Sequence, residues 1–278
     1  MDHNKKQYNL VGRKYINVSP DSLKNNSLPA PIEFIPDKNK NLEWRNILVT
    51  NEEYCLFLNE LRSNGINNIL GGGQVFFNEN MIYERGGRIH FNKTIQKYDI
   101  SAGYKDHPVY WVTWIGASAF ALYKGLRLPK RSEINSLVQN TQISFNTINA
   151  GHKLDDVQPI NAKNYVPREV NNIVGNLAVW CSDGQKLLSN DPQSMTRYIY
   201  GTAWDRPATL KEITKYHFRP LVGNSRAVGI RLVKDLSMQK ISFIELIARI
   251  KKISIILKEK KCFSLHKRDQ AILDLFNL

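Results

Sequence analysis

The stretch HPVYWVTWIGASAFALYKGLRLPKRSE, residues 107–133, decides the fold of this chain. Its early part, VYWVTW, has the β-branched and aromatic composition of a short strand. The small and apolar residues that follow recur at helical spacing, and Gly125 is placed to end that helix as a C-cap. Pro129 suits the first turn of a second helix, and Glu133 would lie near its positive N-terminal end. The stretch therefore predicts a strand followed by two helices.

A further helix is predicted at VTNEEYCLFLNEL, residues 49–61. Its apolar side chains are spaced so that they share one helical face. Thr50 can cap the first turn, and Glu53 stands three residues later, as a capping box requires. Between these helices, residues 64–100 carry short alternating runs that indicate hairpins. Residues 140–235 show little helical pattern and predict long loops.

The composition limits the kinds of partner. The chain has 278 residues and a formal net charge of +14. Such an excess favours phosphate, nucleic acid or an anionic surface, although a solvated lysine-rich surface explains it equally simply. Without a nucleic-acid-binding motif, we do not expect nucleic acid as the partner. The polar N-terminus and the lack of a run of about 18 apolar residues predict neither a secretory signal nor a transmembrane helix, so a soluble, cytoplasmic protein is expected.

The three cysteines, Cys55, Cys181 and Cys262, lie far apart, and none has CxxC spacing. They predict neither a zinc site, nor an iron–sulfur cluster, nor a disulfide framework. Cys55 falls within a predicted helix and is expected to be a buried thiol. Cys181 has no histidine near it in the sequence, and thiolate activation needs a nearby positive group. We therefore interpret Cys181 as a packing residue rather than a nucleophile.

Five separated blocks follow one another along the chain. They are VTNEEYCLFL at 49–58, the stretch 107–133, NNIVGNLAVWCSDG at 171–184, YIYGTAW at 198–204 and VGIRLVKD at 228–235. This order resembles the formylglycine-generating enzyme family, also called the sulfatase-modifying-factor family. The family pattern reads approximately VTNxxYxxF, HPVxxVSWxDAxAYxxWxGxRLPTEAEWE, GNVWEWxSD, RGGSW and GFRxxRD.

The resemblance implies an α+β protein with a C-type-lectin-like fold of the formylglycine-generating-enzyme type, low in regular secondary structure. Residues 45–235 would form this domain. Residues 1–44 would be an extended N-terminal segment that packs on the domain. Residues 236–278 lie outside the resemblance, and their own spacing of apolar and basic residues predicts a basic, amphipathic helical extension at the C-terminus.

The resemblance also implies which metals to expect. Aerobic family enzymes hold copper(I) with two cysteines, because this ion prefers soft thiolate ligands. The corresponding interval, residues 201–231, contains no cysteine, so we expect neither that copper site nor ordinary formylglycine generation. A non-haem iron site needs histidines with a carboxylate, and His107, His152 and His217 lack such spacing.

Calcium is the second expectation that the resemblance carries, since family members fix long loops with this ion and its oxygen ligands. The residues that match one such site are Asn149, the carbonyl of Ala150, Asp155 and Asp156. The alternative is a solvated acidic turn. A second family site uses a glutamate at the position of Val179, so that site is not expected here.

The family's cleft supplies the candidate ligand-binding residues. They are Trp204, Asp205, Tyr216, His217, Arg219 and Arg226. Aromatic and arginine side chains together suit a ligand that is partly apolar and partly anionic. For Trp204 the alternative is a purely structural role, because it lies on a structural motif of the family.

Three functions remain open from the sequence, of which a basic nucleic-acid-binding protein rests on charge alone; the other two concern the cleft. The first is a binding protein whose cleft holds a peptide, a small molecule or a protein partner, which the missing cysteine pair favours. The second is an oxidative tailoring enzyme of a bacterial biosynthetic pathway with a different metal site. The helical extension could dock on its own domain, pair with a second copy or a partner helix, or lie on an anionic membrane surface.

Overall fold

The computed structural model describes residues 30–37, 40–70, 73–78, 87–143, 148–160, 166, 169–186, 195–258 and 265–276, so most of the segment 1–44 and Cys262 lie outside it. The helices are α1 (Asn51–Ser63), α2 (Trp114–Tyr123), α3 (Arg131–Gln139), α4 (Leu210–Ile213), α5 (Phe243–Lys258) and α6 (Leu265–Leu275). The strands are β1 (Phe34–Pro36), β2 (Leu42–Arg45), β3 (Ile69–Leu70), β4 (Gly73–Gln74), β5 (Ile89–Asn92), β6 (Lys97–Ile100), β7 (Ala178–Lys186), β8 (Met195–Tyr200), β9 (Tyr216–Pro220), β10 (Val228–Gly229) and β11 (Val233–Asp235).

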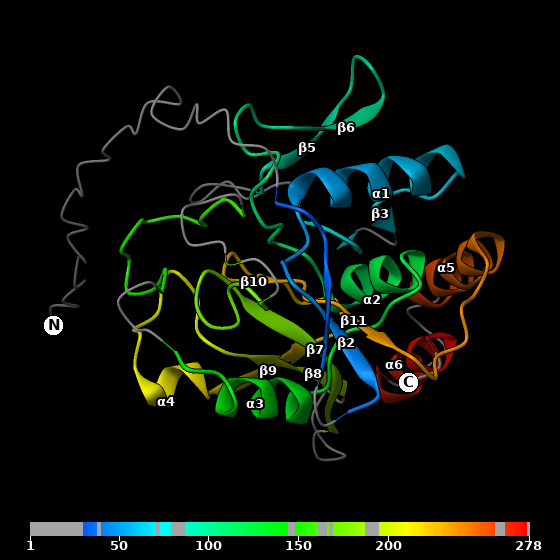
Figure 1. Ribbon diagram of the computed structural model, residues 1–278. Helices are drawn as coiled ribbons and strands as arrows, with labels where there is room; N and C mark the ends of the chain where they lie inside the picture. The colour runs from blue at the N-terminus through cyan, green and yellow to red at the C-terminus, as the bar shows by residue number, and fades with distance from the viewer. Residues whose placement is uncertain are drawn as a thin grey trace, which may run out of the picture.

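Two sheets organise the described residues (Figure 1). The larger has the order β10-β7-β8-β9, with β10 parallel to β7 and the other neighbours antiparallel. The smaller has the order β1-β2-β11, and its pairing of β2 with β11 joins the two ends of the predicted domain. β3 with β4 and β5 with β6 form the hairpins that the sequence predicts between residues 64 and 100. Strand β9 is an edge of the larger sheet, which matters for the candidate site.

Local sequence explains where the first helices begin and end. The Thr50 hydroxyl accepts from the Glu53 amide, and the Glu53 carboxylate accepts from the Thr50 amide, so the predicted capping box of α1 is confirmed. Gly125, at φ +66°, follows the end of α2, which confirms its predicted place. The second predicted helix begins at Arg131, with Lys130 as its N-cap. Pro129 therefore precedes this helix instead of lying in its first turn.

The predicted strand VYWVTW is wrong. Residues 109–113 form no strand, because alternate amides in this stretch donate to three different segments: Val109 to Val49, Trp111 to Ser225 and Thr113 to Phe76. Trp111 also has φ +63°, a left-handed conformation that extended strands do not contain. The stretch instead ties three parts of the core together.

Tryptophans hold the centre of the core. Trp44, Trp114 and Trp180 are fully buried. Trp180 donates its indole N–H to the Val112 carbonyl at 3.0 Å, and Trp114 donates to the Cys181 carbonyl at 2.9 Å. Both polar indole groups are therefore satisfied, as buried tryptophan requires. These two hydrogen bonds hold residues 112–114 against β7.

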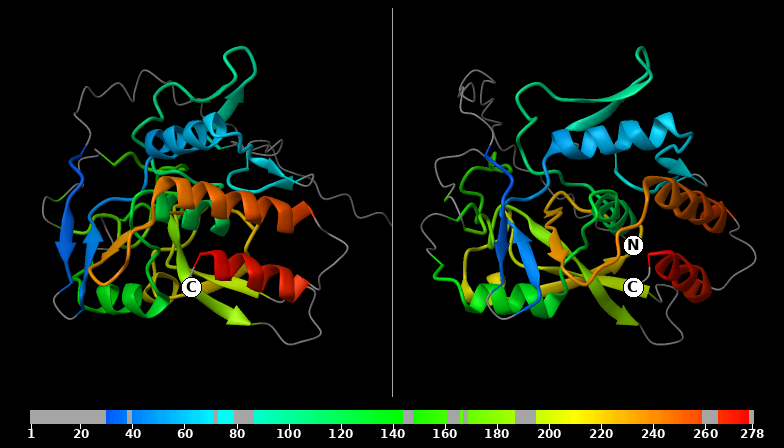
Figure 2. Two further views of the ribbon diagram at one scale, coloured as in Figure 1. Left: turned by 90° about the vertical axis from the view of Figure 1, so that its right-hand side faces the viewer. Right: turned by 45° about the vertical axis from the view of Figure 1, so that its right-hand side comes forward.

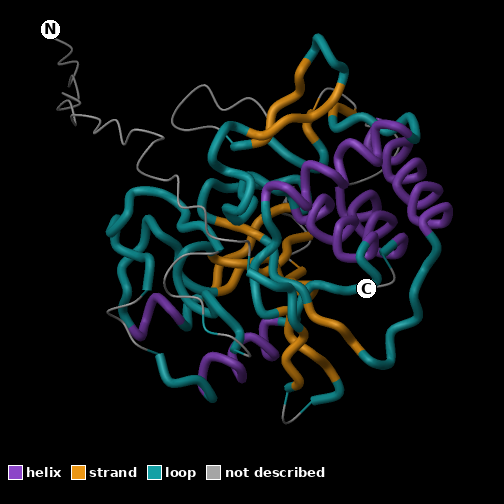
Figure 3. The backbone as a smooth tube through the Cα atoms, turned by 45° about the horizontal axis from the view of Figure 1, so that its top comes forward, coloured by secondary structure: helices purple, strands orange, loops and turns teal. Residues whose placement is uncertain are grey.

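The helical extension packs on the domain. The Phe243 ring of α5 lies 5.7 Å from the Tyr123 ring of α2, and Phe276, just after α6, lies 5.4 Å from Trp114. Figure 2 shows α5 and α6 side by side, and Figure 3 shows several helices gathered on one side of the molecule, while loops form much of the other side. Within the described residues, no helix is long and apolar enough to cross a membrane.

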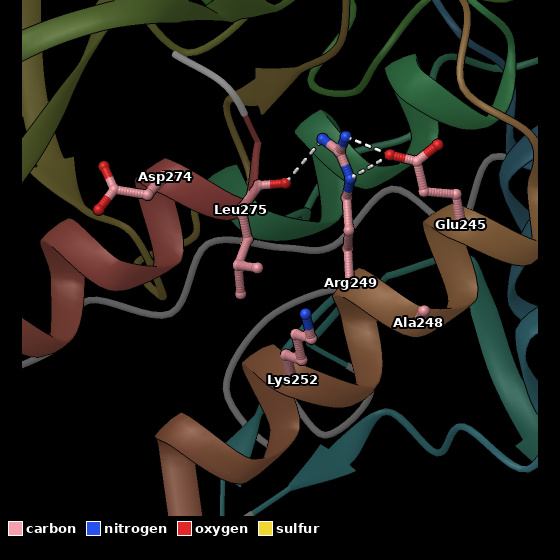
Figure 4. A pocket seen from close by; sticks show the side chains of 6 residues that line it. All are labelled: Glu245, Ala248, Arg249, Lys252, Asp274 and Leu275. Carbon is pink, nitrogen blue, oxygen red and sulfur yellow. Dashed lines mark hydrogen bonds and ion pairs between the residues drawn. The ribbon is translucent and has the colours of Figure 1, made fainter.

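A cavity of about 280 Å³ opens between α5 and α6 (Figure 4). The Arg249 guanidinium crosses it, donating to the Glu245 carboxylate and, at 3.0 Å, to the Leu275 carbonyl near the end of α6. A cation bonded to the last carbonyls of a helix stabilises that end. The polar groups of this cavity thus connect the two helices.

Candidate functional site

Strand β9 presents side chains to both sides of an exposed sheet edge. Its register against β8 places Tyr216 opposite Tyr200 and Phe218 opposite Tyr198. Because side chains alternate along a strand, Tyr216 and Phe218 share one face, and His217 and Arg219 share the other. Tyr216 and Phe218 are each 47% exposed, which is unusual for large aromatic side chains in a sheet.

A guanidinium stacks on the aromatic face. The Arg131 guanidinium carbon lies 4.3 Å from the centre of the Tyr216 ring and 4.7 Å from that of Tyr198. The two tyrosine rings meet edge-to-face at 5.3 Å. The Arg131 amide donates to the Asp183 carboxylate at 2.7 Å, which fixes the start of α3 against β7. This face therefore offers aromatic surface and a positive charge together.

The opposite face of β9 is cationic. Partial burial lowers the pKa of His217, and the nearby charges of Lys215 and Arg206 lower it further. The Glu212 carboxylate opposes them, and it is paired with the Lys215 ammonium at 3.0 Å. His217 is therefore neutral near pH 7, and its surroundings attract anions.

Three predicted residues gather in a second cluster, around Trp204. Its indole ring is buried, the Arg226 guanidinium lies 5.3 Å from the ring centre, and the His152 ring meets it edge-to-face at 5.5 Å. The Asp205 carboxylate lies 3.4 Å from the Arg226 guanidinium. Trp204 also donates to the Arg226 carbonyl at 3.4 Å. These contacts indicate a structural role for the Trp204 side chain, with the paired Arg226 and Asp205 beside it.

The structure thus divides the candidate cleft. Trp204, Asp205 and Arg226 form one group, Tyr216 belongs to the stack with Arg131, and His217 and Arg219 lie on the other face of β9. Arg131 and Tyr198 were missed by sequence reasoning, because Arg131 lies in a different motif. The alternation of Tyr198, Tyr200, Tyr216 and Phe218 along two segments was the available signal.

The residues predicted for calcium lie in one loop but are bonded to protein groups. The Asp156 carboxylate accepts from the Arg88 guanidinium at 2.6 Å and from the Val157 amide at 2.8 Å. The Asn149 amide nitrogen donates to the Asp156 carbonyl and to the Asn176 side chain. The Ala150 carbonyl accepts from the Lys153 amide.

This arrangement does not fit calcium, which takes six to eight converging oxygen ligands. The guanidinium of Arg88 already neutralises Asp156, and the exposed Asp155 faces His152 at 3.2 Å. Asn149 does keep a buried side-chain oxygen without a hydrogen-bond partner. One such acceptor is far short of a calcium ligand set.

A buried polar cluster surrounds Arg88. Its guanidinium carbon lies 3.7 Å from the centre of the Tyr104 ring, and the Tyr104 ring lies 4.8 Å from that of His107. Burial lowers the pKa of His107 to about 4, with Asp156 opposing this effect and Arg88 adding to it. The Nδ1 atom of His107 is buried without a partner. His107 is therefore a neutral core residue.

Both described cysteines are buried. Cys181 is fully buried in β7, and burial together with the charge of Asp183 raises the pKa of its thiol well above the usual range. Burial likewise raises the pKa of Cys55 to about 11. Neither thiol has the thiolate character that nucleophilic or metal-binding cysteines need. Within the described residues, no three His, Cys, Asp or Glu side chains gather closely enough to hold a metal ion.

Comparison with curated proteins gives two related sequences. The chain is 30% identical over 146 residues to the serine/threonine-protein kinase pkn1 of Chlamydia caviae, covering 49% of this chain and 21% of that protein. It is 25% identical over 210 residues to Pkn1 of Chlamydia trachomatis serovar L2, covering 68% of this chain and 32% of that protein. The chain thus spans about a fifth to a third of the length of these relatives, and the match does not assign kinase activity to it. No protein-family model matches the chain.

Comparison with solved structures concerns the fold. CarF matches with a TM-score of 0.50 at 13% identity, covering 70% of this chain and 87% of CarF. PvdO from Pseudomonas aeruginosa (TM-score 0.47, 13% identity, 75% and 93% covered) and Treponema denticola variable protein 1 (0.46, 14%, 75% and 94%) are further matches. These neighbours have folds of the formylglycine-generating-enzyme type. The likeness to CarF indicates that this chain has a mixed helix-and-strand fold of that type.

Proposed function

We propose that this chain is a divergent formylglycine-generating-enzyme-like protein that binds a peptide or protein partner through the surface around β9. In this proposal it does not oxidise a cysteine. The observation that carries the proposal is the stack of Arg131 on the half-buried Tyr198 and the exposed Tyr216. An exposed aromatic surface of this kind, joined to cationic side chains, is typical of recognition sites.

The chemistry of the thiols supports binding over oxidation. The interval 201–231 contains no cysteine, and Cys55 and Cys181 are buried with raised pKa values. His217, the histidine in the candidate cleft, is surrounded by Arg206, Lys215 and Arg219. A metal cation at this position would meet the repulsion of these charges.

Elemental analysis separates the two functions. The protein is purified without chelator, reloaded in turn with copper(I), iron(II) and calcium, desalted and measured. We expect neither copper nor iron to be retained near one ion per chain. Stoichiometric copper or iron that is lost in His217→Ala, but kept in the control His90→Ala, would overturn the proposal in favour of a rebuilt redox site. His90 is the matched control because it is an exposed histidine in β5.

A further inference from the structure

We propose that β9 binds an acidic peptide in extended conformation, which adds to the larger sheet as a further strand beside β9. This inference rests on the proposed binding function and names the class of partner and the way it is held. It differs from recognition by side chains alone, because the main chain of β9 would supply the hydrogen bonds.

The edge of β9 is open. Five residues of β9, from Tyr216 to Pro220, pair with β8 on one side. On the side away from β8, no backbone hydrogen bond joins Tyr216–Arg219 to another segment within the described residues. Such an edge presents unpaired N–H and C=O groups to any extended chain of suitable sequence.

The strand also lacks a proline that would block pairing in its middle. Pro220 stands at its last position, whereas protected edges carry proline or inward-pointing charges within the strand. The residues before it are all exposed, including Tyr216 and Phe218. Apolar side chains of an added strand would rest against these two rings, because neighbouring strands align side chains of the same face.

The charges select an acidic partner. Arg206 and Arg219 are exposed, and neither makes an ion pair within the described part of the chain. Arg219 shares the face of His217 through the alternation along β9, and both arginines lower the pKa of His217, so both charges lie near its ring. The Glu212 carboxylate, whose charge raises the pKa of His217, is paired with Lys215 at 3.0 Å. Carboxylates of a bound peptide would therefore meet two unneutralised guanidinium groups.

Together these features predict the pattern of the partner. Acidic residues at every second position would face His217 and Arg219, and apolar residues between them would face Tyr216 and Phe218. The probe with this pattern is a fluorescein-labelled peptide of sequence Glu-Val-Glu-Tyr-Glu-Val-Glu. Its counterpart Lys-Val-Lys-Tyr-Lys-Val-Lys has the same pattern with reversed charge.

Fluorescence anisotropy at low and physiological salt tests the proposal on the full chain. We expect saturable binding of the acidic peptide and none of the basic peptide. The acidic peptide with N-methyl groups on its three central residues should bind about tenfold more weakly, since it loses main-chain donors that would pair with β9. The double variant Arg206→Glu/Arg219→Glu should lose binding, whereas Lys251→Glu/Lys252→Glu on the exposed side of α5, with the same net charge, should not. Thermal unfolding of each variant checks that it is folded.

The outcomes separate this inference from the proposed function. Equal binding of the plain and N-methylated acidic peptides would overturn strand addition while leaving a binding surface that uses side chains. No saturable binding of the acidic peptide, or binding of the basic one instead, would overturn the inference itself. Failure of the binding function would appear instead as retention of a redox metal in the elemental analysis.

Discussion

The Arg88 guanidinium lies 2.6 Å from the Asp156 carboxylate and 3.7 Å from the centre of the Tyr104 ring. The Arg88 guanidinium thus supplies, from within the protein, the positive charge that the Asp156 carboxylate would otherwise need from a bound metal ion. Both side chains of the ion pair are less than one-fifth exposed. Pairs of this kind are costly to break from one side, because the remaining charge is left without a partner.

We predict that Arg88→Met lowers the free energy of unfolding by about 3 kcal/mol, and that calcium does not change the stability of the wild-type chain. Urea denaturation in EGTA and in calcium chloride measures both effects. Arg62→Met is the matched control, since Arg62 also stacks on an aromatic ring, that of Phe91, but makes no ion pair within the described residues, and its hydrogen bonds are exposed to solvent. A calcium-dependent rise in wild-type stability would show that the loop does bind the ion.

His107 should make stability depend on pH. Its pKa is about 4 in the folded chain, below the ordinary value of 6.5, chiefly because burial disfavours the charged ring. The unfolded chain therefore binds this proton at a higher pH than the folded chain does. The stabilisation is fully present above about pH 6.5 and decreases toward pH 4, by on the order of 3 kcal/mol in all.

Urea denaturation between pH 7.5 and pH 4.5 checks this prediction. His107→Gln should show a shallower decline of stability with falling pH than the wild type, and His90→Gln, at an exposed position, should follow the wild type. An NMR titration that placed the pKa of His107 near 6.5 would contradict the account.

Cys181 should react with a thiol reagent only when the chain unfolds. A variant with Cys55→Ser and Cys262→Ser leaves it as the single thiol. Because this thiol is fully buried and its pKa is raised, labelling by a disulfide reagent should be limited by the rate of opening and should speed up in urea. Rapid labelling in native buffer would mark Cys181 as an accessible, reactive group.

Stability measurements should distinguish residues of the proposed binding surface from residues that stabilise the fold. Tyr216→Ala, at an exposed ring stacked on Arg131, should change the free energy of unfolding by no more than about 1 kcal/mol. Trp204→Ala removes a buried indole that contacts Arg226 and His152, and should cost about 3–5 kcal/mol. Equal losses in the two variants would mean that Tyr216 is structural as well.

Local signals made several elements predictable from the sequence. The capping box of Thr50 with Glu53 and the position of Gly125 identify helix ends through contacts within a few residues. The order of the five blocks indicated the type of fold that the likeness to CarF supports. In contrast, VYWVTW has strand composition, yet its amides bond to three distant segments, which strand propensity does not describe.

The arrangement of the site was less predictable, because it depends on contacts between residues far apart in the sequence. Arg88 and Asp156 are separated by 68 positions, and no spacing rule relates them. The stack of Arg131 on Tyr216 joins the start of α3 to an edge strand in the same way. The sequence predicted Tyr216 and His217 together as cleft residues, but only the register of β9 shows that they face opposite sides of the sheet.

Hydrogen–deuterium exchange is the most direct test of whether the surface around β9 binds a partner. Exchange is followed by mass spectrometry with and without saturating Glu-Val-Glu-Tyr-Glu-Val-Glu. We expect slower exchange of the amides in Tyr216–Arg219 and unchanged exchange in α5. Unchanged exchange across β9, with protection elsewhere or nowhere, would contradict the proposal.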